Sequence, residues 1–117
     1  MQYLILIYQD EQRASEIPPD EMETMMGEYF AYSNALRDEE VARGGNALER
    51  SSMARSIRVR DGERIVTDGP YAETREQLGG YYLIECETEE QAIDAAARCP
   101  GAKWGTVELR PIWEIPA

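Results

Sequence analysis

The spacing of hydrophobic and polar positions predicts a strand followed by a long helix in the first third of the chain. Residues 3–8 form a continuous run of apolar and β-forming side chains, which is typical of a strand covered on both faces. From Pro19 to about Arg43, apolar residues recur at helical spacing behind an acidic first turn. The glycine pair at 44–45 follows, so we expect the helix to end there.

In the middle of the chain the period shortens to two, which predicts a β-hairpin. Side chains alternate over residues 53–60, the Asp-Gly pair at 61–62 is a strong hairpin-turn signal, and residues 64–67 form the returning strand. The Asp-Gly-Pro sequence at 68–70 ends this pairing, because proline donates no backbone hydrogen bond. Residues 71–77 then predict a loop with one helical turn.

The last third of the chain predicts a strand, a second helix and a closing strand. Residues 81–86 form the strand, Thr88 and Gln91 make a capping box that begins the helix, and the Pro-Gly pair at 100–101 ends it. Residues 106–110 form the closing strand. The order of elements, with one strand more than the pattern needs, fits the ferredoxin-like βαββαβ pattern of the α+β class, in which two helices cover one face of a four-stranded antiparallel sheet.

The length predicts one domain, and the first strand predicts a partner for it. A chain of 117 residues has the size of a single domain over residues 1–117, and no repeat, low-complexity tract or linker divides it. In the strand at 3–8, both sets of alternating side chains are apolar or aromatic. Because a large apolar sheet face in a soluble protein marks an interface, we expect a homodimer that packs through the sheet face.

Charge and composition narrow the classes of partner. The net charge of −11 repels phosphate backbones, so we expect no nucleic acid partner. No stretch is long enough to cross a membrane, and the N-terminus lacks the features of a signal peptide, so we expect no membrane association. Cys86 and Cys99 fit no metal or redox spacing, which favours a cytoplasmic location with reduced thiols over a structural disulfide.

The absence of histidine limits the possible chemistry most. It removes the commonest general base and the commonest zinc ligand. We expect no metal site and no cofactor, and any catalysis must use a carboxylate, tyrosine, cysteine, lysine or arginine. The helical spacing of Met22, Met25 and Met26 favours core packing over a soft-metal or ligand patch.

Asp68 is the leading candidate for a catalytic residue. As an aspartate before Gly-Pro, it is either a turn residue that caps backbone amides or a carboxylate at the mouth of a cleft that accepts a proton or anchors a ligand. Tyr8, at a strand end, and Tyr71, beside Asp68, are candidates for ligand binding, although tyrosine more often serves as a core or interface residue.

Two arginines on predicted strands are further candidates for ligand binding. Arg58 and Arg110 lie among apolar residues, where an arginine is solvated, pairs with a carboxylate such as Glu85 or Glu108, or binds a carboxylate ligand. Pairing across strands is the commonest of these arrangements.

The segment at 68–85, DGPYAETREQLGGYYLIE, resembles the signature of the YCII-related family, and in particular its DGPF branch. The resemblance continues in the strand at 3–8, in the hairpin at 58–62 and in the strand at 107–112, so it covers nearly the whole chain. It implies a dimeric α+β barrel with an enzyme-like cleft that holds an aspartate. The YCII branch proper also has a histidine there, which this chain lacks, and Tyr71 stands where the DGPF branch has phenylalanine.

Two functional hypotheses remain open. The first is a small dimeric enzyme that acts by proton transfer on a small anionic metabolite. Its cleft would lie between the sheet and the long helix, with Asp68 as the base and with Tyr8, Arg58, Tyr71 and Arg110 binding the ligand. The second is a non-catalytic ligand-binding or protein-interaction module, linked by the family resemblance to sigma-factor-related regulation. The missing histidine favours this second hypothesis.

Overall fold

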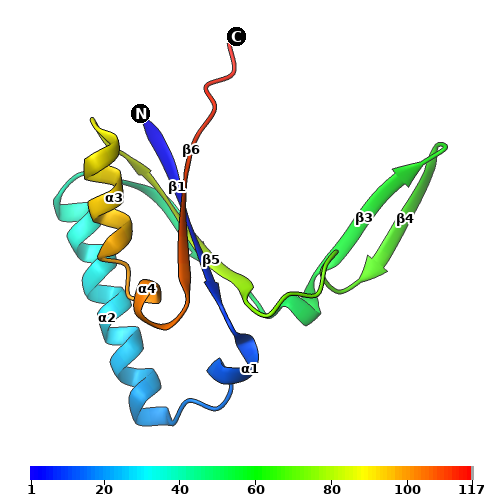
Figure 1. Ribbon diagram of the computed structural model, residues 1–117, viewed down its shortest axis with the longest axis horizontal. Helices are drawn as coiled ribbons and strands as arrows, with labels where there is room; N and C mark the ends of the chain where they lie inside the picture. Colours follow the sequence, from blue (N-terminus) through cyan, green and yellow to red (C-terminus); the bar gives the residue numbers. More distant parts are fainter. Residues whose placement is uncertain (117) are drawn as a thin grey trace.

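The computed structural model describes residues 1–116, and Figure 1 shows a sheet with helices against one face and a β-hairpin that projects from it. The elements in chain order are β1 (Gln2–Gln9), α1 (Glu11–Ala14), α2 (Pro19–Asp38), β2 (Ala42–Ala47), the short 3₁₀ helix η1 (Ser51–Met53), β3 (Arg55–Arg60), β4 (Glu63–Asp68), β5 (Gln77–Glu85), α3 (Glu89–Ala97), α4 (Gly101–Trp104) and β6 (Thr106–Pro111).

The main sheet is antiparallel and has the strand order β2-β5-β1-β6, which confirms the predicted four-stranded α+β fold. Tyr3, Ile5 and Ile7 of β1 face α2 and α3 and are buried, whereas the alternate residues of β1 are half-buried on the opposite, open face. The core side chains are Tyr3, Ile5, Ile7, Tyr32, Leu36, Val41, Ile84, Cys86, Ala92, Ala95, Ala96 and Cys99.

The long helix is shorter than its sequence pattern predicts. Helix α2 ends at Asp38, and Glu40, with a φ of 61°, turns the chain so that residues 42–47 form the edge strand β2. The predicted end at the glycine pair is therefore wrong. Gly45 lies inside β2, where a Cβ atom would stand 2.8 Å from the carbonyl oxygen of Tyr81, so glycine permits the close approach of β2 to β5.

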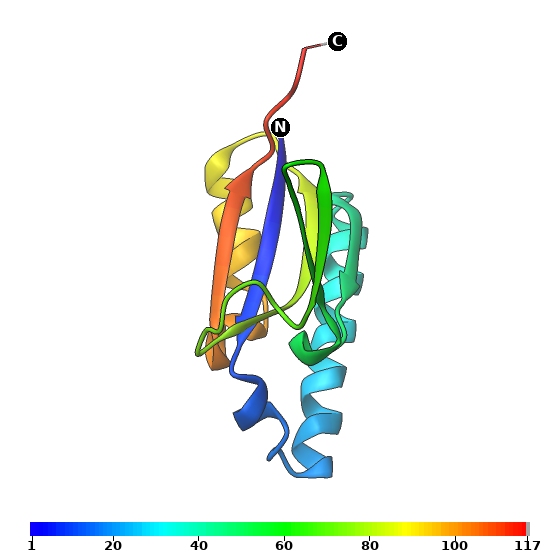
Figure 2. The same cartoon turned by 90° about the vertical axis from the view of Figure 1, so that its right-hand side faces the viewer.

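The predicted hairpin forms, but outside the main sheet. Strands β3 and β4 pair only with each other, and Asp61 and Gly62 both have positive φ, as a type I′ turn requires. We call this hairpin, residues Arg55–Asp68, the arm. The sequence pattern predicts that the hairpin belongs to the four-stranded sheet. Strand β2 instead forms the edge of that sheet, next to β5. The arm leaves the sheet on the side away from α2 and α3, and Figure 2 shows it in front of the open face.

The second helix begins where its capping signal predicts. The Thr88 side chain accepts a hydrogen bond from the Gln91 amide at 3.1 Å, and the Gln91 side chain accepts one from the Glu87 amide at 2.9 Å. Helix α3 ends at Ala97, and the predicted helix stop at 100–101 instead begins α4. Cys86 and Cys99 are free and buried. Over residues 1–116, no helix is both long and apolar enough to cross a membrane.

Candidate functional site

A cavity of about 440 Å³ lies between α2, β2 and β5. Its floor comprises two rows of paired residues on the helix side of the sheet, Ile7–Gly80–Ala47 and Tyr82–Gly45. Gly80, Gly45 and Ala47 carry little or no side chain, so the space above them stays open. The cavity is lined by Ile7, Gln9, Ala14, Ile17, Met22, Met25, Met26, Tyr29, Ser33, Gly45, Asn46, Ala47, Leu48, Gly79, Gly80, Tyr81 and Tyr82.

Three methionines of α2 form the wall opposite this floor. The buried residues of α2, Tyr32 and Leu36, both lie in its C-terminal half, and the N-terminal half extends past the sheet (Figure 1). Met22 and Met26 are 38% and 48% exposed, and Met25 is half-buried. The prediction that the methionines pack in the core is therefore wrong. The floor residues are too small to reach the methionine side chains across the cavity.

The polar residues that line the cavity are Gln9, Asn46 and several with hydroxyl groups. Ser33 Oγ and Tyr82 Oη share a hydrogen bond of 2.8 Å, and the Tyr82 ring meets Tyr32 edge-on at 5.2 Å between centroids. Burial raises the pKa of the Tyr29 hydroxyl well above its usual value, so this group stays neutral. Among the described residues, none that lines the cavity carries a charge. The cavity can hold an apolar molecule and orient one or two of its polar atoms.

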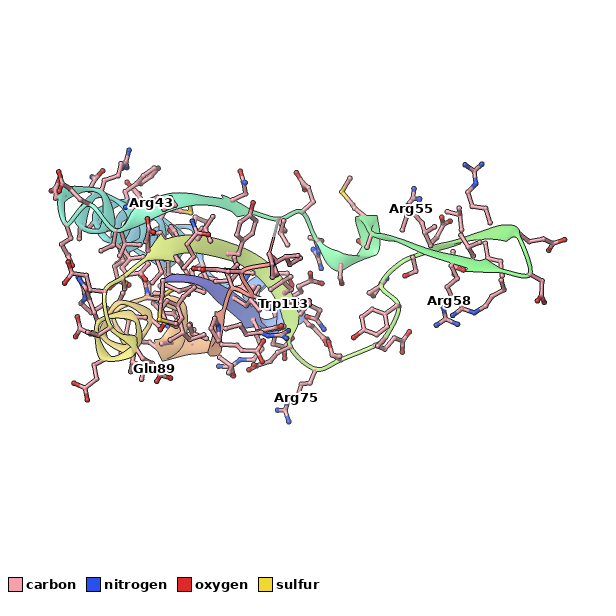
Figure 3. All side chains as sticks on the ribbon, turned by 90° about the horizontal axis from the view of Figure 1, so that it is seen from above. Arg43, Arg55, Arg58, Arg75, Glu89 and Trp113 are labelled. Carbon is pink, nitrogen blue, oxygen red and sulfur yellow. The ribbon has the colours of Figure 1, made fainter. Side chains whose placement is uncertain are left out.

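The predicted catalytic residue lies on the arm and does not line this cavity. Asp68 ends β4 with its side chain 88% exposed, and a carboxylate oxygen lies 3.2 Å from Arg55 Nε. Arg58 lies on the opposite face of the arm, as Figure 3 shows, and Tyr71 is 84% exposed in the loop that follows. Asp68 and Arg58 are thus on one element, but they do not point to a common site.

Tyr8 and Arg110 lie together on the open face of the sheet. The Tyr8 hydroxyl donates a hydrogen bond of 3.3 Å to Glu108 Oε1. Partial burial raises the pKa of Tyr8, the Glu108 carboxylate raises it further, and Arg110 acts in the opposite direction. The structure therefore brings Tyr8, Glu108 and Arg110 together. The sequence predicted Glu108 only as a carboxylate that pairs with an arginine, and not as a partner of Tyr8.

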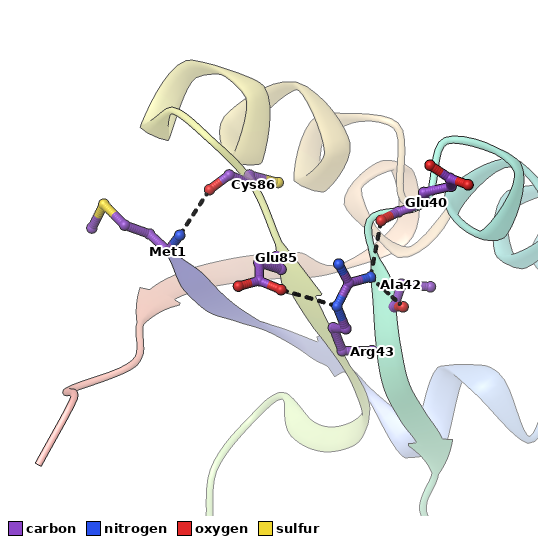
Figure 4. Close-up of polar contacts among 6 residues, drawn as sticks. All are labelled: Met1, Glu40, Ala42, Arg43, Glu85 and Cys86. Atoms are coloured by element: carbon purple, nitrogen blue, oxygen red, sulfur yellow. Dashed lines mark hydrogen bonds and ion pairs between the residues drawn. The ribbon is translucent and has the colours of Figure 1, made fainter.

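Glu85 pairs with a residue that the sequence pattern places in a helix. Arg43 Nε lies 3.0 Å from a Glu85 carboxylate oxygen, and Arg43 Nη1 donates to the carbonyl oxygens of Glu40 and Ala42 at 2.9 and 3.0 Å (Figure 4). Pairing of Glu85 with Arg58 or Arg110 is therefore wrong. Because β2 was not predicted, sequence reasoning had no reason to place Arg43 beside β5.

Asp10 and Glu11, which follow β1, have structural contacts. Asp10 caps α1 by accepting hydrogen bonds from two backbone amides, and the Glu11 carboxylate accepts from the amide and hydroxyl of Ser51, both at 2.7 Å. These groups border a second, polar hollow that also contains Arg50 and Arg75. Within residues 1–116, no group of three or more acidic or cysteine side chains is arranged to hold a metal ion.

Comparisons with known proteins identify the family. The family model of the YCII-related domain matches residues 1–116. An uncharacterized protein of Rhizobium meliloti (strain 1021) is 38% identical over 118 residues, which cover 96% of this chain and 92% of that protein. The solved structure of 5-chloro-2-hydroxyhydroquinone dehydrochlorinase (TftG) from Burkholderia phenoliruptrix AC1100, in complex with 2,5-dihydroxybenzoquinone, aligns with 97% of this chain and 94% of its own. The two chains are 13% identical, and the TM-score is 0.49. The match over nearly the whole chain and the close relative together mean that this chain belongs to the YCII-related family.

Proposed function

We propose that the cavity between α2 and the sheet binds a small, largely apolar molecule. The observation that carries the proposal is the lining, which combines a volume of about 440 Å³ with an uncharged, mostly apolar surface. This volume falls within the range of known small-molecule sites. The methionine wall can adapt to ligands of different shape, and the Ser33–Tyr82 hydroxyl pair supplies a donor and an acceptor.

The charge of the lining bears on the class of ligand. A charged molecule would lose its hydration on entering and would find no counter-ion among the lining residues. This supports a neutral ligand rather than the anionic metabolite expected from the arginines in the sequence. The absence of a carboxylate from the lining also supports binding without proton transfer at this cavity.

A cavity-filling variant tests this proposal. Ala47→Phe adds a ring to the cavity floor, whereas Ala31→Phe adds the same ring to the exposed side of α2. We expect wild type and Ala31→Phe to bind the neutral fluorophore N-phenyl-1-naphthylamine with similar Kd, and Ala47→Phe to bind it at least about tenfold more weakly, which is about 1.4 kcal/mol. Equal affinity of all three proteins in a fluorescence titration would rule the cavity out as the binding site.

We further propose a homodimer that packs through the open face of the main sheet and completes a dimeric α+β barrel. Leu4, Leu6 and Leu83 lie on that face and are only half-buried in the single chain, which supports a covering partner. A monomer mass at micromolar concentration in sedimentation velocity would contradict the dimer.

The narrower hypotheses from the sequence stay predictions. The segment at 68–85 supports membership of the DGPF branch. Asp68 does not line the cavity, so catalysis by Asp68 would take place outside it. A protein-interaction role linked to sigma-factor-related regulation stays a prediction of the family resemblance.

A further inference from the structure

The arm has one apolar face and one polar face. Directly paired residues of β3 and β4 share a face, so the pairs alternate between the two sides. The apolar face comprises Ile57, Val59, Val66, Arg64 and the Arg55–Asp68 ion pair. The polar face comprises Ser56, Arg58, Arg60, Glu63, Thr67 and the single apolar residue Ile65.

The apolar face is uncovered in the single chain. Ile57, Val59 and Val66 are 64%, 61% and 53% exposed, and every residue of the arm except Ser56 is exposed. A two-stranded hairpin without further packing is at best marginally stable in water. The arm therefore needs a surface that covers its apolar face.

The distribution of charge favours a second copy of this chain as that surface. The arm has four arginines and three carboxylates, which gives it a net charge of +1. Because the whole chain has a net charge of −11, the rest of the chain has a net charge of −12. A second copy therefore presents an acidic body to an arm with an excess of positive charge. Such complementarity steers the association of the two copies.

The position of the arm is compatible with this occupant. The arm and the open face of the sheet lie on the same side of the molecule, away from α2 and α3 (Figures 1 and 2). A copy whose sheet packs on the open face consequently lies next to the arm. In a two-fold dimer each arm would meet the other chain in the same way, so every contact is made twice.

We propose that the apolar face of the arm docks on a second copy of this chain, so that two copies clasp each other with their arms. This inference rests on the homodimer proposed above, and it adds that the arm of each chain contributes to the dimer interface. Because Asp68 and Arg55 lie on the docking face, they meet the second copy, whereas Arg58 points away from it.

Two neighbouring residues of β4 provide a matched test. Val66 and Ile65 are both β-branched and exposed, but Val66 lies on the apolar face and Ile65 on the polar face. Aspartate has the same low strand propensity at either position. In sedimentation velocity, we expect wild type and Ile65→Asp to show the same dimer dissociation constant and Val66→Asp to raise it at least tenfold. Ile57→Asp, on the apolar face of β3, should reproduce the effect and replaces Val66→Asp if that variant does not fold.

The other outcomes separate the arm from the dimer itself. A dimeric wild type with unchanged association of Val66→Asp and Ile57→Asp would overturn the docking of the arm and leave the sheet-face dimer standing. An equal loss in Ile65→Asp would also overturn it, because the effect would then come from arm folding and not from one face. A wild type that is monomeric at all concentrations would overturn both. In the wild type, protection of arm amides from hydrogen exchange must rise with protein concentration, and its absence would contradict the docking.

Discussion

The glycine pair in β2 leads to opposite predictions for two adjacent residues. A Cβ atom at Gly45 would lie 2.8 Å from the carbonyl oxygen of Tyr81 and 3.3 Å from the Cα atom of Tyr82, whereas a Cβ atom at Gly44 would meet nothing within 4 Å. Gly45→Ala thus forces β2 away from β5, and Gly44→Ala does not. The clash involves backbone atoms, which cannot rotate out of the way as a side chain can.

The magnitude follows from the distances. Ordinary carbon–oxygen contacts begin near 3.4 Å, so the strands at Gly45 must separate by several tenths of an ångström. Overpacking of this kind costs about 1–3 kcal/mol. At Gly44, alanine restricts the unfolded chain and should stabilise the protein by about 0.4–1 kcal/mol. The two variants should therefore differ by about 1.4–4 kcal/mol in their free energy of unfolding.

Urea denaturation at one fixed protein concentration measures this difference, because the stability of a dimer depends on concentration. Gly45→Ala should also change the affinity of the cavity for N-phenyl-1-naphthylamine, since Gly45 lies in the cavity floor. Equal free energies of unfolding for the two variants would refute the close approach of β2 and β5, and with it the geometry of the floor.

Two further predictions concern a buried hydrogen bond in the core and the loss of stability at acidic pH. Tyr32→Phe removes a buried hydrogen bond of 2.7 Å to the Ala95 carbonyl oxygen, which should lower the free energy of unfolding by about 1–2 kcal/mol in urea denaturation; Tyr3→Phe, whose hydroxyl faces only the Met1 sulfur at 3.8 Å, is the control and should change little. The Arg98 hydrogen bonds lower the pKa of Glu39, so its contribution to stability is present above the pKa of an unfolded glutamate and is lost as the pH falls through the folded value. Glu39→Gln should flatten the decline of stability with falling pH in that range, and an unchanged slope would contradict it.

Elements with strong local signals were predictable from the sequence. The first strand, the hairpin turn at Asp61-Gly62 and the cap of α3 at Thr88 all formed where expected, because each depends on a few neighbouring residues. Strand β2 was not predictable in this way. Its sequence, Ala-Arg-Gly-Gly-Asn-Ala, has no preference for strand, and it forms because β5 offers a backbone edge that only the folded sheet creates.

The cavity was missed for a related reason. Helical periodicity identifies the face of α2 that carries Met22, Met25 and Met26, but it does not say what lies opposite. The opposite surface consists of small residues of β2 and β5, and one of these strands was not predicted. Glycine and alanine in a sheet indicate a close approach or an open space only when their partners across the strands are known.

The last part of the family segment at 68–85 lines the cavity through residues 79–82, whereas its first residues hold the base of the arm. Gly69 has a φ of 93°, which favours glycine, and its amide donates to the Ala54 carbonyl oxygen at 2.8 Å while its own carbonyl accepts from the Ser56 hydroxyl at 2.8 Å. These bonds close the hairpin at the point where it leaves the sheet. They hold the two ends of the arm together beside Asp68, which would meet the second chain in the proposed dimer. A role for Asp68 in binding or catalysis would then be a property of the assembled dimer rather than of one chain.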